Sequence, residues 1–254
     1  MLLVIDIGNS NTVFGVYDGA TLRHHFRLET ARQRTSDEYG IMFRALLSAR
    51  GLDARGVSAA IVASVVPTLT QTFVEVCREY CGAEALVIGP GVKTGMPILY
   101  DNPKEVGADR IVNAVAAYAR YQAAVVVVDL GTATTFDAIS AKGEYLGGAI
   151  TPGIGISMEA LFLRASKLPR IELSRPKSAI GKNTVHAMQA GILFGYAGLI
   201  DSMVQRIRVE IGGTVRVIAT GGLATLIADE AKSIEAVDEF LTLEGLRLIW
   251  NLNQ

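Results

Sequence analysis

Two stretches of the chain begin in the same way, and this repeat limits the folds open to it more than any other feature. Residues 2–17 consist of an apolar run, Asp6, a polar turn and a second apolar run. Residues 125–139 repeat that order around Asp129. Runs of Val, Ile and Leu that end in a turn are typical of buried β-strands. The repeat therefore predicts two related halves, each starting with a strand that ends at an aspartate.

The match extends into the turns. Aligning the two aspartates places Gly8 on Gly131 and Thr12 on Thr135, and each stretch is followed by a hairpin-type turn, at Asp18-Gly19 and at residues 141–144. Later in each half a helical pattern is followed by a further apolar strand, at residues 59–67 in the first half and 215–224 in the second. Strands that alternate with helices predict an α/β fold with a largely parallel sheet core and antiparallel hairpins at its start. We expect two related domains over residues 1–113 and 114–254, joined by a helix, with a ligand cleft between them.

The composition of the chain argues against several classes of protein. Half of the 254 residues are hydrophobic and 19% are charged, which disfavours disorder. The formal net charge is −1 and no Lys/Arg run occurs, so nothing indicates a nucleic-acid or membrane-surface partner. The N-terminus lacks a signal-peptide pattern, and the longest apolar run, residues 123–128, is too short to span a membrane. Cys77 and Cys81 are expected to be buried thiols. A cytoplasmic protein is the expectation.

The chemistry of the first turn indicates phosphate binding. The Asp6 carboxylate is expected at the carboxyl end of a strand, the usual ligand side of a parallel sheet. Gly8 allows a sharp turn, and the residues after it offer backbone N–H groups and small polar side chains that suit a phosphate. A carboxylate beside them would hold Mg²⁺. An ordinary strand-to-turn connection is the alternative, and the second copy of the pattern weighs against it.

Two further glycine segments need separate interpretations. Residues 220–222, Thr-Gly-Gly, follow a buried strand and would let the backbone approach a flat adenine ring, although a plain strand-to-helix turn has the same pattern. Residues 89–95 resemble a P-loop, but Val92 precedes Lys93 where a P-loop needs glycine, and Met96-Pro97 prevents a helix from starting there. We predict a loop without phosphate-binding function.

Four blocks, in order along the chain, carry a family resemblance. They are residues 6–11 (DIGNSN), 107–110 (GADR), 129–134 (DLGTAT) and 147–153 (GGAITPG). The sequence closely resembles type III pantothenate kinase over nearly its whole length. That family belongs to the actin/hexokinase/Hsp70-like superfamily, so the resemblance implies duplicated ribonuclease-H-like domains with an ATP cleft between them. Ser10 departs from the family, which more often has threonine, and keeps the hydroxyl group.

The resemblance implies ATP-dependent phosphorylation of pantothenate to 4'-phosphopantothenate, the entry step to coenzyme A. It assigns Asp109 as the general base that accepts the hydroxyl proton. Gly107 and Ala108 leave room for the substrate, and the planar fork of Arg110 suits its carboxylate or amide carbonyls. Tyr100 is implied as a further substrate contact. Without the resemblance, Asp109-Arg110 would be read as a solvated helix face, and Tyr100 as a packed aromatic residue.

The resemblance also implies how ATP and its cations are held. Asp129 helps to hold a monovalent cation, K⁺ or NH₄⁺, Thr132 reaches an ATP phosphate, and Asp6 is the Mg²⁺ partner. Neither glycine turn contains a lysine, so cations are expected to supply the positive charge. The complete set of expected ATP-binding residues is Asp6, Ile7, Gly8, Asn9, Ser10, Asn11, Thr12, Val13 and Thr132.

The helical stretch from Asn183 to Val209 has two interpretations. Asn183 or Thr184 could cap the helix, while the resemblance implies Thr184 as a substrate contact at a homodimer interface. Small residues along this helix would permit close packing, either between subunits or within one.

Two rival functions remain open. The same fold could phosphorylate a sugar or another small acid, although Tyr100, Arg110 and Thr184 suit an acid-bearing substrate better than a sugar. It could also serve as a non-enzymatic regulatory or assembly protein. Carboxylates gathered at one site are costly without a cation, so Asp6, Asp109 and Asp129 weigh against a purely structural role.

Overall fold

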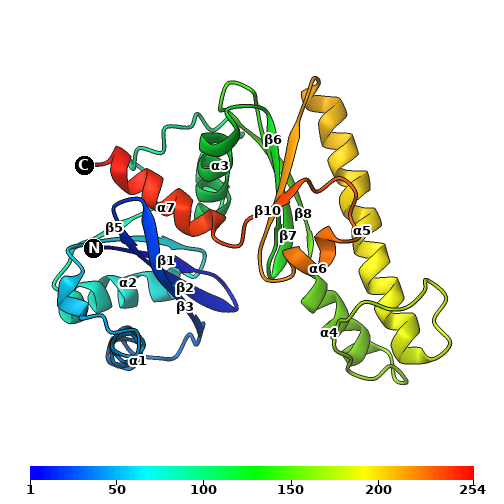
Figure 1. The fold of residues 1–254 in the computed structure, drawn as a ribbon, viewed down its shortest axis with the longest axis horizontal. Coiled ribbons are helices and arrows are strands. Elements are labelled where there is room, and N and C mark those ends of the chain that lie inside the picture. The colour runs from blue at the N-terminus through cyan, green and yellow to red at the C-terminus, as the bar shows by residue number, and fades with distance from the viewer. The chain divides into compact units, whose positions relative to one another are not determined.

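A computed structural model describes all 254 residues, which form two compact units. Unit 1 contains residues 1–96, 101–116 and 241–254, and unit 2 contains residues 97–100 and 117–240. Each unit is built on its own five-stranded sheet, and the two sheets are separate (Figure 1).

The sheet of unit 1 has the order β3-β2-β1-β4-β5. Its first three strands form antiparallel hairpins, and β4 and β5 add in parallel to β1. This mixture of pairings confirms the predicted hairpins in front of a parallel core. The strands are β1 (Leu2–Ile7), β2 (Asn11–Asp18), β3 (Thr21–Glu29), β4 (Ala59–Ser64) and β5 (Ala85–Val87).

Helices cover both faces of this sheet. Figure 1 shows α1 and α2 on one face and α7 on the other. Under α1 and α2 lies a core of aromatic and aliphatic side chains, including Phe14, Tyr39, Phe43 and Phe73, all fully buried. A capping box between Thr35 and Glu38 starts α1. The helical elements are α1 (Ser36–Ser48), α2 (Pro67–Val76), α3 (Ala108–Tyr121) and α7 (Leu241–Leu252), with short 3₁₀ turns at Ala54–Gly56 and Pro103–Glu105.

The end of α2 differs slightly from the expected regular helix. Residues Cys77–Cys81 form a π-helical turn that closes at Gly82, in the left-handed conformation. Both cysteines are free and buried, which confirms the interpretation as packed thiols. Burial raises the pKa of Cys81 to about 11 and that of Cys77 further, so neither thiol ionises readily.

Unit 2 repeats the sheet of unit 1, in the order β10-β9-β6-β7-β8. Strands β6, β7 and β8 form antiparallel hairpins, whereas β9 pairs in parallel with β6 and β10 in parallel with β9. Since β1 and β6 occupy the same place in their sheets, the duplication predicted from the two aspartate turns is present in the topology. The strands are β6 (Val125–Leu130), β7 (Ala133–Ile139), β8 (Tyr145–Pro152), β9 (Arg216–Thr220) and β10 (Ala236–Val237).

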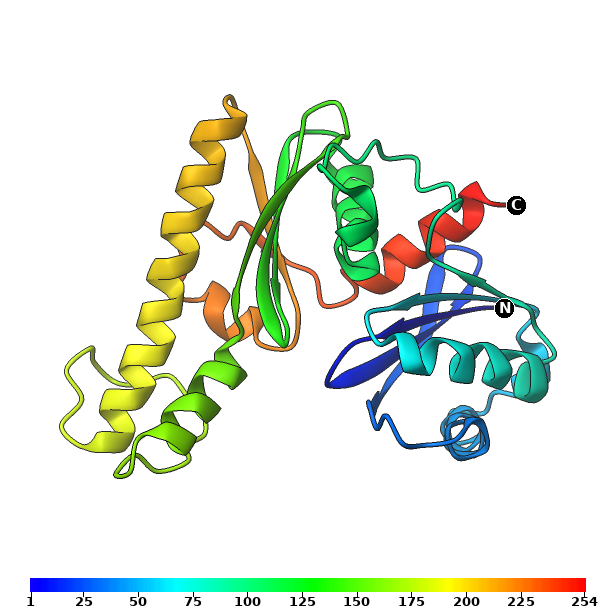
Figure 2. The same ribbon diagram turned by 180° about the vertical axis from the view of Figure 1, so that it is seen from behind.

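Three helices of unit 2 are α4 (Ile154–Arg164), α5 (Thr184–Ile211) and α6 (Ala224–Ala228). The long helix α5 runs beside the sheet, and its buried side chains join the sheet in one core (Figure 2). By length and composition alone α5 could cross a membrane, but half of its most apolar window is buried within the protein. A core helix of a soluble protein has the same character.

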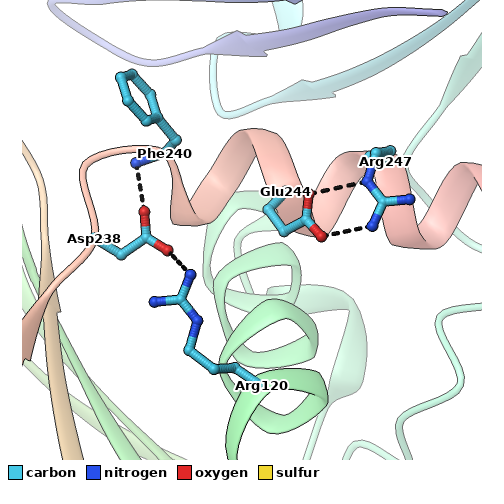
Figure 3. Close-up of polar contacts among 5 residues, drawn as sticks. All are labelled: Arg120, Asp238, Phe240, Glu244 and Arg247. Atoms are coloured by element: carbon cyan, nitrogen blue, oxygen red, sulfur yellow. Dashed lines mark hydrogen bonds and ion pairs between the residues drawn. The ribbon is translucent and has the colours of Figure 1, made fainter. Parts of the chain in front are cut away.

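The chain passes between the units at four points, two of which lie near charged pairs (Figure 3). In unit 2, the Asp238 carboxylate accepts a hydrogen bond from the Phe240 N–H at 2.9 Å and forms an ion pair with Arg120 of α3. In unit 1, Arg247 donates two hydrogen bonds to Glu244, at 2.9 and 2.6 Å, on α7. Helix α3 runs from unit 1 into unit 2, and α7 returns the chain to unit 1. The domain limits 1–113 and 114–254 stay a prediction. The two compact units divide the chain differently, because α7 belongs to unit 1 together with the first sheet.

Candidate active site

The polar turn after Asp6 connects β1 to β2 in unit 1. The Gly8 N–H donates to the Asn11 carbonyl at 3.0 Å, which closes the turn. A side chain at Gly8 would meet that same carbonyl, since a Cβ built there lies 2.9 Å from it. Asn9, Ser10 and Asn11 are exposed. The turn therefore presents polar groups to solvent at the carboxyl end of β1, as the sequence predicted.

The predicted base, Asp109, belongs to the same unit as this turn. A chain of contacts leads from one to the other: the Val65 N–H donates to the Ile7 carbonyl at 3.0 Å, and the Val65 side chain lies 3.7 Å from a Cβ built on Gly107. Asp109 follows in the first turn of α3. The start of α3 thus lies beside the ends of β1 and β4.

Gly107 has a specific steric reason to be glycine. A Cβ at this position would lie 2.5 Å from Oδ1 of Asp109, so any side chain would push the carboxylate away. The same Oδ1 accepts a hydrogen bond from the Arg110 N–H at 2.8 Å. Glycine at position 107 therefore leaves the Asp109 carboxyl group the room that it occupies.

Burial raises the pKa of the Asp109 carboxyl group above its ordinary value. The hydrogen bond from the Arg110 N–H and the Arg110 guanidinium act in the opposite direction and offset part of this rise. A carboxylate whose pKa is raised is a stronger base and therefore accepts a proton more readily. Such an environment is typical of a general base.

Arg110 is buried, with 7% of its surface exposed, and Ala108 is half-buried. The alternative of an ordinary solvated helix face for Asp109-Arg110 is therefore wrong. Burying a guanidinium next to a desolvated carboxyl group costs free energy, and binding an anion is one way to offset that cost.

In unit 2, the Asp129 carboxylate lies between two glycine turns. Oδ1 is 3.5 Å from a Cβ built on Gly131 and 2.7 Å from one built on Gly221. Gly221 also has φ +95°, a left-handed conformation that other residues rarely adopt. Gly221, which was expected to face adenine, thus lies beside the Asp129 carboxylate. A Cβ on Gly222 would meet nothing within 4 Å.

Strand pairing corrects the overlay of the two turns. Four residues separate Ile7 from its partner Thr12, but three separate Leu130 from its partner Thr134. Thr12 therefore corresponds to Thr134, not to Thr135, and both are fully buried. The alignment on the aspartates was wrong after the turn because the first turn is one residue longer.

The block of residues 147–153 connects two of the predicted site residues of unit 2. Gly147 has φ +116°, and a Cβ on it would touch the ring of Tyr100 at 3.4 Å. Tyr100 is half-buried and also packs near Tyr145, with ring centroids 6.4 Å apart. At the other end, the Gly153 N–H donates to the carbonyl of Thr132 at 3.1 Å. These glycines let the chain lie close to Tyr100 and Thr132.

The two interpretations of the start of α5 can now be separated. Asn183 is the N-cap residue, and its Oδ1 accepts a hydrogen bond from the His186 N–H at 2.8 Å. Thr184 is the first residue of the helix and is exposed. Because Asn183 makes the cap, the Thr184 hydroxyl is not needed for it and remains predicted as a substrate contact.

Sequence reasoning missed the segment that follows β3. The Thr30 hydroxyl donates to the Gly8 carbonyl at 2.8 Å, and Arg32 Nη2 donates to Asn9 Oδ1 at 3.1 Å. Both side chains therefore contact the turn after Asp6. The available signal was a short segment with two arginines, Arg32 and Arg34, between a strand and a capping box.

The donor set suits cations that are shared with a ligand. No group of three or more His, Cys, Asp or Glu side chains lies together as a metal cluster. Mg²⁺ bound with a nucleotide uses one or two carboxylates together with phosphate oxygens and water, which a carboxylate such as Asp6 can match.

The duplicated sheet with an aspartate-glycine turn in each copy defines a fold class, that of duplicated actin-like α/β domains. The crystal structure of an inorganic polyphosphate/ATP-glucomannokinase from Arthrobacter sp. strain KM has this fold, with TM-score 0.54 and 17% identity over 100% of this chain and 99% of that one. A Baf family protein from Campylobacter jejuni, assigned as a transcriptional activator, gives TM-score 0.62 and 21% identity over 99% of this chain and 98% of that one.

Sequence similarity narrows the class to one family. The family model described as type III pantothenate kinase matches residues 2–206. The chain is also 61% identical over 253 residues to the type III pantothenate kinase of Myxococcus xanthus (strain DK1622), covering 100% of this chain and 99% of that relative. The chain belongs to the type III pantothenate kinase family, as the sequence blocks predicted.

Proposed function

We propose that this protein transfers the γ-phosphate of ATP to the hydroxyl group of pantothenate, giving 4'-phosphopantothenate and ADP in the first step of coenzyme A biosynthesis. The observation that carries the proposal is the buried Asp109 carboxyl group at the start of α3, beside the strand ends that carry the Asp6 turn. Membership of the family supports the choice of substrate.

Asp109 acts as the general base. The hydroxyl oxygen of pantothenate attacks the γ-phosphorus, the bond from that phosphorus to the β–γ bridging oxygen breaks, and the hydroxyl proton passes to Asp109. Burial of the carboxyl group favours this transfer because it raises the pKa of Asp109. The hydrogen bond from the Arg110 N–H holds Asp109 Oδ1, and glycine at position 107 leaves room for it.

Further residues are assigned to substrate recognition besides Asp109. In unit 1, the guanidinium of Arg110 pairs with the carboxylate or amide carbonyls of pantothenate, and Gly107 and Ala108 give it room. In unit 2, Tyr100 and Thr184 are the predicted contacts. The hydrogen-bonded cap at Asn183 supports this role for Thr184, since it leaves the threonine hydroxyl available.

ATP is assigned to the segment from Asp6 to Val13 and to Thr132. When bound, the cations offset the negative charge of the triphosphate and of its transition state. Asp6 is the proposed Mg²⁺ partner, and Asp129 the proposed partner of K⁺ or NH₄⁺. Gly221 supports the second assignment, because a Cβ at that position would lie 2.7 Å from Asp129 Oδ1 and collide with it.

We also propose a homodimer that forms through α5. Gly191, Gly195 and Gly198 follow the spacing of one helix face, they are exposed, and a Cβ on any of them would meet nothing within 4 Å. Apolar side chains of the neighbouring helix α4 are also exposed, including Leu163 at 66%. An uncovered face of small and apolar residues is typical of a subunit interface. We further propose that the protein is cytoplasmic.

A coupled ATP-consumption assay tests the function. Purified protein with Mg²⁺, ATP, K⁺ and pantothenate should show turnover that is lost without pantothenate and falls steeply without K⁺. Glucose and a small hydroxy acid without the amide, supplied in place of pantothenate, test the rival acceptors. Turnover with one of these alone would assign a different kinase, and no turnover with any acceptor in the presence of K⁺ would leave only a non-enzymatic role.

A further inference from the structure

The segment Thr30–Arg34 connects β3 to α1, and we call it the strap. Its first residue is bound to the turn after Asp6 twice: the Thr30 N–H donates to the Ser10 carbonyl at 3.0 Å, and the Thr30 hydroxyl donates to the Gly8 carbonyl at 2.8 Å. The strap therefore follows the turn and cannot move away from it without breaking these bonds.

The next residue is fixed from the opposite side, by the core of unit 1. The Ala31 N–H donates to the hydroxyl oxygen of Tyr39 at 2.8 Å, and that hydroxyl donates to the Ala31 carbonyl at 3.0 Å. Tyr39 itself is fully buried in the aromatic core under α1. A buried tyrosine thus sets the position of the backbone immediately before Arg32.

Arg32 projects from this fixed backbone to the exposed turn. Its Nη2 donates to Asn9 Oδ1 at 3.1 Å, and no Asp or Glu forms an ion pair with it. A guanidinium has five N–H donors in a planar fork, and one bond to a neutral amide leaves the charge and most of the donors available. The arginine is therefore an uncompensated cation next to a turn that has no lysine.

We propose that Arg32 binds the polyphosphate of ATP and supplies the basic side chain that the glycine turns themselves lack. The inference rests on the proposed function, because it needs ATP at the Asp6 turn. The guanidinium fork pairs with two phosphate oxygens at once, which a hydrated cation does not do. Because the strap is already fixed at Thr30 and Ala31, little backbone entropy is lost when Arg32 binds.

Equilibrium binding of ATP, ADP and AMP, measured by calorimetry with Mg²⁺ and without pantothenate, tests the inference. The variants are Arg32→Gln, Arg32→Lys and, as a charge-matched control, Arg50→Gln. Arg50 is exposed and lies beyond the far end of α1, about 20 Å along that helix from the strap. Thermal unfolding of each variant verifies that the exposed substitutions leave the fold intact.

We expect Arg32→Gln to weaken ATP binding by about 10- to 100-fold, the usual effect of losing a charge-assisted pair, and to change AMP binding less than about twofold. Arg32→Lys should recover part of the loss, because it restores the charge without the fork. Arg50→Gln should bind all three nucleotides as the wild type does.

Two results would overturn the inference: ATP affinity of Arg32→Gln within about twofold of the wild type, or an equal loss for AMP and ATP. The equal loss would show that Arg32 only supports the shape of the turn. Wild-type turnover with pantothenate is measured in parallel. If the wild type binds ATP but does not phosphorylate pantothenate, the proposed function fails while the comparison of variants still decides the role of Arg32. If the wild type binds no ATP, both fail.

Discussion

The turns after Asp6 and Asp129 are built alike up to the end of the third strand in each unit. In each, a glycine N–H closes the turn on a carbonyl of the next strand, at 3.0 Å from Gly8 and 3.1 Å from Gly131. In each, the residue after the third strand donates its N–H to a turn carbonyl, from Thr30 in unit 1 and from Gly153 in unit 2. The backbone hydrogen bonds of the two turns are therefore arranged alike, although the first turn is one residue longer.

The two units differ in what the chain does next. In unit 1 it continues as the strap, with a threonine side chain at its start and Arg32 two residues later. In unit 2, Gly153 is the N-cap residue of α4 and the chain enters a helix at once. The same hairpin can therefore carry a cationic strap in one unit and a carboxylate between glycines in the other. The proposed roles of the turns, phosphate and Mg²⁺ at Asp6 and a monovalent cation at Asp129, follow this difference.

The largest expected effect concerns the proposed base, which lies in unit 1. Asp109→Asn should lower kcat by about 10²- to 10⁴-fold, because the amide cannot accept the hydroxyl proton, and should leave ATP binding nearly unchanged. Steady-state kinetics and calorimetry measure the two effects. Near-wild-type kcat in this variant would remove Asp109 as the base and break the division of roles between the units.

A stability measurement controls for misfolding of that variant. Burial raises the folded-state pKa of Asp109 above its unfolded value of about 3.9, so the carboxyl group contributes stability below that value and loses the contribution as pH rises through the folded pKa. Asp109→Asn has no ionisation to oppose burial. At pH 7 it should melt at or slightly above the wild-type temperature, with the advantage shrinking toward pH 4. A variant that melts lower at pH 7 would contradict this account.

Next in size is the steric difference between Thr30 and Gly153. A Cβ on Gly153 would lie 2.2 Å from the Thr132 carbonyl oxygen and 2.6 Å from that of Gly131, both backbone atoms. Gly153→Ala should therefore lower the free energy of unfolding by about 3 kcal/mol. Gly155→Ala, in the first turn of α4 with nothing within 4 Å, is the matched control and should be neutral or stabilising by up to about 1 kcal/mol. Equal effects in chemical unfolding would show that the close approach at Gly153 is unimportant.

The proposed cation site of unit 2 should give a smaller effect. Asp129→Asn removes the charge beside Gly131 and Gly221, and we expect the K⁺ concentration for half-maximal activity to rise by about tenfold or more. At saturating K⁺ much of the rate should return, unlike in Asp109→Asn. Titration of activity with KCl at constant ionic strength measures this. An unchanged K⁺ response would remove Asp129 from the cation site.

The topology could be predicted from the sequence because it depends on patterns that repeat. The aspartate-glycine turns, the hairpin turns at Asp18-Gly19 and residues 141–144, and the apolar strands all lie where the sequence indicated. The register after the turns could not be predicted, because one extra residue in a turn leaves the sequence patterns on both sides of it almost unchanged. Pairing in the sheet decided that Thr12 matches Thr134.

The site was predictable only where family motifs mark it. Asp109 and Gly107 lie together in the GADR block, so the block indicated the proposed base, but the burial of Asp109 depends on strands far away in the sequence. Arg32 was not predicted, since its contact with Asn9 joins residues 23 positions apart through the end of β3. A pattern within one segment does not reveal such contacts between segments.

The smallest expected effects concern Thr12 and Thr134, the two buried threonines at equivalent positions in the two sheets. The Thr30 hydroxyl donates its single proton to the Gly8 carbonyl, so the Thr12 hydroxyl must donate to Thr30 Oγ1, at 3.0 Å. The Thr134 hydroxyl is buried without any hydrogen-bond partner, because unit 2 has no strap and Thr151 donates instead to the Thr134 carbonyl. One hydroxyl is satisfied by the strap and the other is not.

Replacing each threonine with valine should therefore change stability in opposite directions. Thr12→Val should cost about 1 kcal/mol, because it removes a buried hydrogen bond, and Thr134→Val should gain about 1 kcal/mol, because it removes a buried hydroxyl that has no partner. Thr134→Ser, which keeps the hydroxyl and loses a methyl group, is the control and should destabilise. Denaturant unfolding gives all three values. If both valine variants lose stability, the Thr134 hydroxyl has a partner after all, and the two units are more alike at these turns than their third strands indicate.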